Sequence, residues 1–282
     1  MEQIPNSDIG GHRTLKHFEC ETSEAEKSFG RAARNVIEKH AEHALVVHQA
    51  DWHLRGVLHH TRNVLATYTE FADEIASRAS IDPLPDVIIM YAPSFQTMMF
   101  EFYALVNLSR ITLDNIRLFL RPVFKTDFGQ LPKSVNKFLQ GKTDCPAYLD
   151  LADNPVLQYL SDLRNCIVHF RTFATSDNAV VVGDHVGQDE QEKLLSGNEW
   201  FDPMAKAHFR WVGDDVSVNV LLPDRIFDHS GSTEKMVKFT YVERYNLLSQ
   251  SMNFMRLICY AIGKVYSLLI DPGKPTFVFS KS

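Results

Sequence analysis

The chain has 282 residues, of which 45% are hydrophobic and 23% are charged, a composition that can bury a substantial globular core. Its formal net charge of −6 argues against a general nucleic-acid coat, because affinity for polyphosphate requires concentrated Lys and Arg. The sequence has no run of about 18 apolar residues and no signal-peptide core, so we expect a cytoplasmic protein without a membrane partner. Its four cysteines include no CxxC pair, so we expect reduced thiols.

The first expected elements are helical. Residues 1–22 are polar and are expected to form an N-terminal arm. Ser23 and Glu26 then match a capping box, and helical patterning continues to about residue 80. We therefore expect residues 23–80 to form a long helical region or a helical hairpin.

A helix of more than fifty residues would be unusual in a globular protein. Gly30, Gly56 and the 49–51 interruption are the positions at which we expect it to kink or reverse. Residues 81–85 contain two prolines and are expected to form a linker.

A second long helix is expected from Pro93 to Arg121, where Pro122 ends it. Polar residues recur along it at helical spacing and form one stripe. The stripe could be a solvent face with ion pairs between its own members at i, i+3 and i, i+4. Alternatively, its arginines could bind phosphate groups. The members of the stripe are Asn107, Arg110, Asp114, Arg117 and Arg121.

A third helix is expected to begin at Pro155, because Asp153 and Asn154 supply a capping residue before it. Its apolar residues fall within one narrow stripe, which is the expected core face. These are Val156, Leu160, Leu163, Ile167 and Phe170. Polar residues project away from that stripe, so we expect them outside the core. These are Ser161, Arg164, Asn165, His169 and Thr172, and the apolar Val168 lies among them.

The pattern changes after this helix. Residues 179–182, 208–212 and 216–221 are rich in branched and aromatic side chains and are expected to be strands. Helical patterning returns over residues 234–269. The sequence thus predicts a mainly α protein, a helical bundle with a small antiparallel β insertion at about 177–228, between the third helix and the C-terminal helix. Residues 86–282 are expected to form this bundle.

The third helix carries the most informative residues, Arg164, Asn165 and His169. A guanidinium can hold a phosphate and an imidazole can move a proton near neutral pH, so the trio suits metal-free phosphodiester chemistry. The segment resembles the signature of the HEPN superfamily, in which Arg is followed after four to six residues by His, with Asn, Asp or His favoured directly after the Arg.

The resemblance implies a HEPN-like helical bundle that acts as a metal-independent endoribonuclease and needs no cofactor. In such domains two copies usually dimerise with their motifs facing each other across one cleft. Val168 lies within the motif face and would contact the second copy. The implied partners are RNA, a second copy of the chain, and an antitoxin or another protein of a defence system.

In the mechanism that we expect, the ribose 2′-hydroxyl attacks its own phosphate and leaves a cyclic phosphate end. His169 would move the proton, Arg164 would stabilise the transition-state charge, and Asn165 would orient the phosphate or the imidazole. Looser copies of the motif occur at Arg34-Asn35-x4-His40 and Arg55-x4-His60, but only the third copy has a favourable helix context.

The segment from Arg110 to Lys142 has seven basic residues against two acidic ones, whereas 177–202 has seven acidic residues against one lysine. A basic groove beside an acidic flap is one interpretation, and two solvated faces are the other. On the first interpretation, additional arginines would bind RNA. These are Arg110, Arg117, Arg121 and Arg171.

Several alternatives remain open at this point. The motif face could be a solvated polar surface without a function, or the chain could be a non-catalytic HEPN-like module for dimerisation or RNA binding, because a motif does not guarantee turnover. A ligand-binding regulator with the β insertion as its lid is a third possibility. We expect no metal site, because no HExxH or cysteine pattern accompanies the N-terminal histidines. These are His40, His43, His59 and His60.

Overall fold

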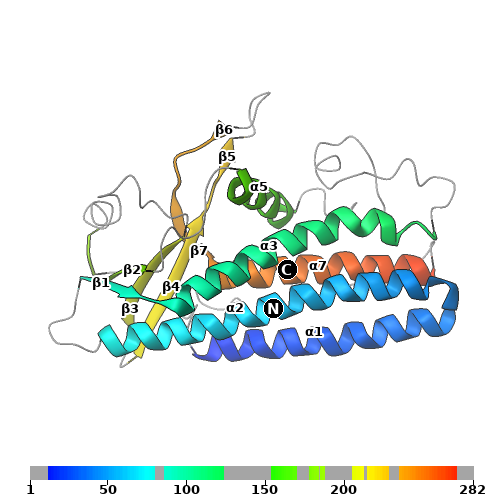
Figure 1. Cartoon of the computed structure of the whole chain (residues 1–282), viewed down its shortest axis with the longest axis horizontal. Coiled ribbons are helices and arrows are strands. Elements are labelled where there is room, and N and C mark those ends of the chain that lie inside the picture. The colour runs from blue at the N-terminus through cyan, green and yellow to red at the C-terminus, as the bar shows by residue number, and fades with distance from the viewer. Residues whose placement is uncertain are drawn as a thin grey trace.

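A computed structural model describes residues 12–79, 86–123, 154–169, 178–183, 185–187, 205–212, 215–228 and 235–271. The fold is mostly helical with a small mixed sheet, as expected for a mainly α protein. The long helices lie side by side, and the sheet forms one end of the molecule (Figure 1). The helices are α1 His12–Lys39, the 3-10 turn η2 Ala41–His43, α2 Ala44–Ala79, α3 Pro93–Phe119, α5 Pro155–His169 and α7 Leu247–Ile270.

Helices α1 and α2 form the predicted hairpin, but its reversal lies at η2 and not at a glycine. Gly56 instead allows close packing, since a Cβ there would come within 2.5 Å of the Leu108 side chain of α3. The prediction that residues 1–22 form an arm is also wrong from residue 12 onward. Helix α1 begins at that residue, and Leu15 and Phe18 are buried, so this segment is part of the bundle. The remainder of the predicted arm lies outside the described residues.

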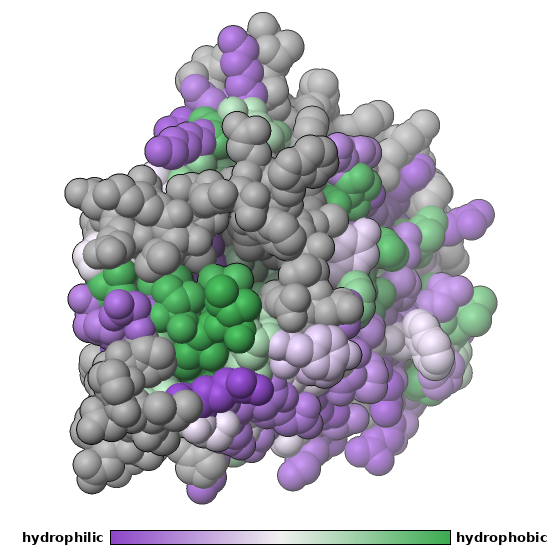
Figure 2. All heavy atoms as spheres, turned by 60° about the vertical axis from the view of Figure 1, so that its left-hand side comes forward, coloured by the Kyte–Doolittle hydropathy of each residue, from purple (hydrophilic) through white to green (hydrophobic). Residues whose placement is uncertain are grey.

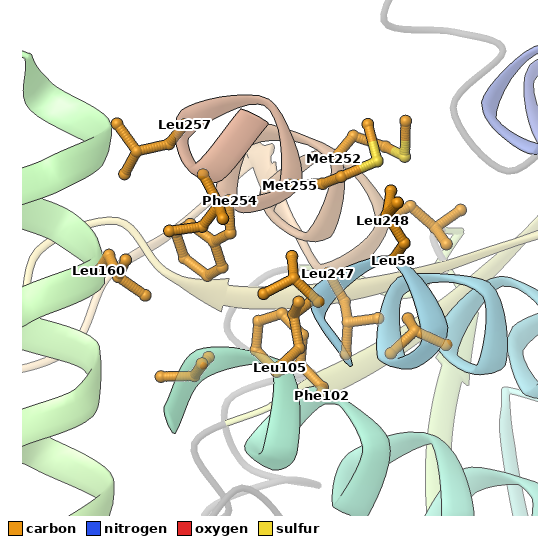
Figure 3. Close-up of a cluster of buried hydrophobic side chains, with 14 of the residues drawn as sticks. Leu58, Phe102, Leu105, Leu160, Leu247, Leu248, Met252, Phe254, Met255 and Leu257 are labelled. Atoms are coloured by element: carbon orange, nitrogen blue, oxygen red, sulfur yellow. The ribbon is translucent and has the colours of Figure 1, made fainter. Parts of the chain in front are cut away.

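The core of the bundle joins helices that are far apart in the sequence. Figure 3 shows Leu58 of α2, Phe102 of α3, Leu160 of α5 and Phe254 of α7 pointing into one apolar cluster, and all four side chains are buried. Each such side chain contributes about 1.5–3 kcal/mol when removed from water. One continuous cluster includes residues from both sides of the predicted boundary at 80–86, so the described residues share a single core.

The sheet has the strand order β1-β2-β3-β4-β7. It is mixed, not antiparallel as predicted, because β2 and β3 run parallel to each other. Strands β1 and β7 were missed, and they lie outside the predicted insertion. A second, two-stranded sheet pairs β5 with β6. The strands are β1 Val87–Tyr91, β2 Asn178–Gly183, β3 Lys206–Val212, β4 Asp215–Pro223, β5 Phe227–Asp228, β6 Lys235–Met236 and β7 Tyr241–Asn246.

Strand β1 alternates between two environments. Ile88 and Met90 are buried, whereas Ile89 is exposed and pairs directly with Val180 of β2, which is also exposed. Figure 2 shows that an apolar patch lies on the surface at this end of the molecule. The outer face of β1 and β2 therefore carries exposed apolar side chains, whereas the solvated face of an antiparallel pair commonly carries polar ones.

Helix α7 begins at Leu247, well after the start predicted at residue 234. The residues before it pair with β4 as strand β7, and Asn246 caps the helix by accepting a 2.8 Å hydrogen bond from the Ser249 amide. Among the described helices, α7 alone has an apolar stretch long enough to cross a membrane, by length and composition. However, 72% of that apolar window is buried inside the protein, as in the core helix of a bundle.

His208 of β3 is a buried base whose titration should affect stability. Burial, with a smaller contribution from the charge of Lys206, lowers the pKa of His208 to about 4. An unfolded histidine has a pKa near 6.5, so between these values only the unfolded state binds the proton. The free energy of unfolding should therefore fall as the pH drops, by roughly 2 kcal/mol between pH 7 and pH 5.

Urea denaturation at the two pH values measures this loss. A His208→Gln variant lacks the titrating group, so its stability should depend less on pH. If wild type and variant lose equal stability over this interval, the lowered pKa of His208 is contradicted.

Candidate functional site

The predicted motif lies on helix α5, whose observed start agrees with the sequence prediction. The Asn154 side chain accepts a 2.9 Å hydrogen bond from the Val156 amide, and Pro155 occupies the first helical position. The helix ends at His169, so the motif occupies its last turns. The capping residue and the proline thus fix where along the chain the motif becomes helical.

The inner side of α5 anchors the motif helix to the rest of the protein. Its described apolar residues are buried as predicted, except Val156, which is partly buried, and Phe170 lies outside the described residues. The Tyr159 hydroxyl donates a 2.8 Å hydrogen bond to the carbonyl oxygen of Pro223, at the end of β4. The Tyr159 ring also packs edge-on against Tyr245, with 4.9 Å between centroids. Helix α5 is therefore held by both the bundle and the sheet.

Arg110 holds α5 against α3 and is not part of an exposed stripe. Its side chain is only 5% exposed, and its Nη1 donates a 2.7 Å hydrogen bond to the Ser161 hydroxyl. The predicted pair with Asp114 is present, with 3.4 Å between Nε and the carboxylate. These contacts correct two expectations, that Ser161 lies outside the core and that Arg110 is available to RNA phosphates. A buried guanidinium keeps such partners because an unpaired buried charge is costly.

The side of α5 that carries the motif, called the motif face, begins next to the contact between Arg110 and Ser161 and extends toward the C-terminal end of the helix. Arg164, Asn165 and Val168 follow Ser161 at i+3, i+4 and i+7, so they share one side of the helix. Arg164 is half-buried, and its Nη1 lies 3.4 Å from the Asn165 side-chain oxygen, which can accept a weak hydrogen bond from it. His169 is exposed at the end of the helix. The three proposed catalytic residues are thus brought to one outward-facing end of α5.

Val168 and Cys166 differ in their surroundings, although both lie inside the motif. Cys166 is fully buried, in agreement with a packing role. Val168 is 40% exposed and lies on the same side of the helix as the polar Arg164 and Asn165. The exposed Val168 side chain is therefore accessible to a partner surface on the motif face.

The remaining predicted RNA contacts lie on or just after α3, or outside the described residues. Arg117 is half-buried on the last turn of α3, and Arg121 is exposed in the turn that follows. Arg171 lies outside the described residues. Both described arginines thus lie at the C-terminal end of α3.

Comparisons with known proteins identify no relative. No protein-family model, no curated protein and no solved structure matches this chain. The resemblance to the HEPN superfamily consequently rests on the motif at Arg164 and on its position near the end of a helix.

A separate shallow cleft of about 340 Å³ lies between α2 and α3, and sequence reasoning did not find it. The ring nitrogens of His53 lie 3.3 Å from the Thr112 hydroxyl and 3.3 Å from the Asn115 amide, and burial lowers the pKa of His53. Trp52 beside it is 78% exposed. No residue of the α5 motif lines this cleft. The lining residues are His48, Gln49, Trp52, His53, Asn115, Leu118 and Phe119.

Proposed function

We propose that this protein is a HEPN-like, metal-independent endoribonuclease whose reacting groups come from α5. The observation that supports the proposal is the arrangement of Arg164, Asn165 and His169 at the outward end of one well-anchored helix. Arg164 and His169 are about 7.5 Å apart along the helix axis. Their side chains could close this distance around one phosphodiester group. The buried contacts behind the helix keep the reacting groups in place.

The reaction balances without an external cofactor. The ribose 2′-oxygen forms a bond to phosphorus while the bond from phosphorus to the 5′-oxygen breaks. His169 accepts the proton of the 2′-hydroxyl and later releases it to solvent, while a water molecule gives a proton to the departing 5′-oxygen, so that protons balance over the reaction. Arg164 stabilises the negative charge that develops on the phosphate, and Asn165 orients Arg164 or the phosphate through its side-chain oxygen or amide. The products are a cyclic phosphate end and a 5′-hydroxyl end.

The site needs a cover, because phosphoryl chemistry benefits from groups held in a dry, preorganised cleft. We propose that a second copy of the chain supplies it, with the exposed Val168 in the contact and the two motifs facing each other. The same apolar residue would also suit a non-catalytic dimerisation module, which is the second candidate function. The proposal also includes RNA as the substrate, a further protein of a defence system as a partner, and a cytoplasmic location.

The deciding experiment is to incubate the protein with mixed RNA in the presence of EDTA and to analyse the cut ends. We expect cleavage to persist and to leave cyclic phosphates. Single-stranded DNA should stay intact, since it lacks the 2′-hydroxyl. Cleavage only after addition of Mg²⁺ or Mn²⁺, or equal cleavage of DNA, would contradict the mechanism. Binding of RNA without any cleavage would favour the non-catalytic module.

A further inference from the structure

A cluster of metal-ligating side chains lies at the corner between α1 and α2. His40, Glu42 and His43 each direct a ligand atom to the same region, and these three atoms all lie within 4.8 Å of one another. His40 Nδ1 is 3.4 Å from Glu42 Oε1, and His43 Nε2 is 4.0 Å from the same oxygen. The corner is at the end of the bundle opposite the sheet (Figure 1).

The backbone of the corner fixes how these ligands are spaced. The His40 amide donates to the Val36 carbonyl at 2.8 Å, and the His43 amide donates to the His40 carbonyl at 2.9 Å. The second of these bonds closes the 3-10 turn and brings His40 and His43 to the same corner. Their rings are stacked, with centroids 5.5 Å apart and planes at 21°. Because the chain reverses here, the cluster is tied to both helices of the hairpin.

We propose that His40, Glu42 and His43 bind one divalent transition-metal ion of the zinc class. Two imidazole nitrogens and one carboxylate oxygen are ligands that suit Zn²⁺, whereas Mg²⁺ and Ca²⁺ prefer oxygen alone. Metal–ligand bonds of about 2.0–2.1 Å in a tetrahedral arrangement place ligand atoms about 3.4 Å apart. The pair His40–Glu42 already has this spacing, and the pair His43–Glu42 reaches it after a small side-chain rotation. A solvent molecule would complete the coordination.

The electrostatics of the corner favour the charged form of the carboxylate. The pKa of Glu42 is lowered, first by a backbone hydrogen bond within residue 42 and then by the neighbouring imidazoles. Without a metal, the same residues can form ion pairs only when a histidine is protonated. A metal requires the neutral imidazoles, so proton and metal compete for the same nitrogens.

This site is independent of the proposed nuclease chemistry, which uses no metal and depends on α5. The sequence did not reveal it, because a helical metal pair is expected at i, i+4, as in HExxH. Here the ligands follow at i, i+2 and i+3, a spacing that converges only because the chain forms a 3-10 turn at this point.

The test uses the full chain without an affinity tag, stripped of metals and titrated with Zn²⁺ by calorimetry and with Co²⁺ by its visible absorption. We expect one equivalent to bind at pH 7.5 and the thermal midpoint to rise with Zn²⁺, since the ion binds only the folded corner. His40→Ala and His43→Ala should each weaken binding at least about tenfold. His59→Ala is the matched control, because His59 is another histidine of the hairpin but lies outside the cluster.

Equal affinity in wild type and in His40→Ala or His43→Ala would overturn the proposal, as would the lack of any bound equivalent. An equal loss in His59→Ala would also overturn it. The readout involves no RNA, so its failure leaves the proposed ribonuclease intact. Conversely, a chain that binds zinc at this corner but does not cleave RNA would contradict only the proposed function.

Discussion

Replacement of Arg164 or His169 with alanine is expected to abolish RNA cleavage, with a decrease of about 10²–10⁴-fold in rate for each variant. The His169 variant lacks the group that accepts the proton. The Arg164 variant lacks the charge that stabilises the transition state. Neither residue is fully buried, so the fold should survive both changes. Cleavage of a labelled RNA under single-turnover conditions measures the rate, and circular dichroism checks the helical content.

The two looser motif copies provide the controls. His40→Ala and His60→Ala should retain cleavage close to wild type, although His60→Ala should lose some stability, because His60 Nδ1 lies 2.7 Å from Glu101. If one of these variants is inactive while His169→Ala cleaves RNA normally, the assignment of the site to α5 is wrong.

Replacement of Val168 with aspartate is expected to weaken the dimer by about 100-fold or more and to remove activity. A two-fold interface would bring the two new carboxylates close together in a desolvated contact, where like charges repel strongly. Val168 is 40% exposed in the single chain, so the helical content should not change. Sedimentation over a range of protein concentrations measures the dimer affinity.

The matched control for this prediction is Leu45→Asp. Leu45 is also an exposed apolar residue, 72% exposed, but it lies at the start of α2 and not on α5. This change should leave both the dimer and the cleavage rate unaltered. A wild-type protein that is monomeric yet fully active, or a dimer that Val168→Asp does not weaken, would contradict the composite site.

Local signals in the sequence predicted the helices that carry the candidate site. Pro93 and Asn154-Pro155 mark the observed starts of α3 and α5, because a capping side chain and a proline determine local backbone geometry. The reversal at η2 was not found, since the residues of that corner include neither glycine nor proline. Sequence periodicity therefore located elements better than it located the turns between them.

Contacts between distant residues were beyond the reach of sequence reasoning. Arg110 and Ser161 looked like members of polar faces, and only the packing of α5 on α3 buries them together. Strands β1 and β7 were missed because each is short and lies directly before a long helix, and each depends on a partner strand elsewhere in the chain. Helical spacing placed Arg164, Asn165 and His169 away from the apolar stripe of α5, and in the structure the first two are half-buried and His169 is exposed.

The order of strands in the sheet has a consequence for how the chain acquires its structure during synthesis. The hairpin of α1 and α2 needs only neighbouring residues and can form early, whereas β1 must wait for β2, about 90 residues later. Helix α7, which is buried along most of its length, is synthesised after the other described elements. Until then, the apolar sides of α2, α3 and α5 have no complete partner, so the nascent chain exposes the surface that later becomes its core.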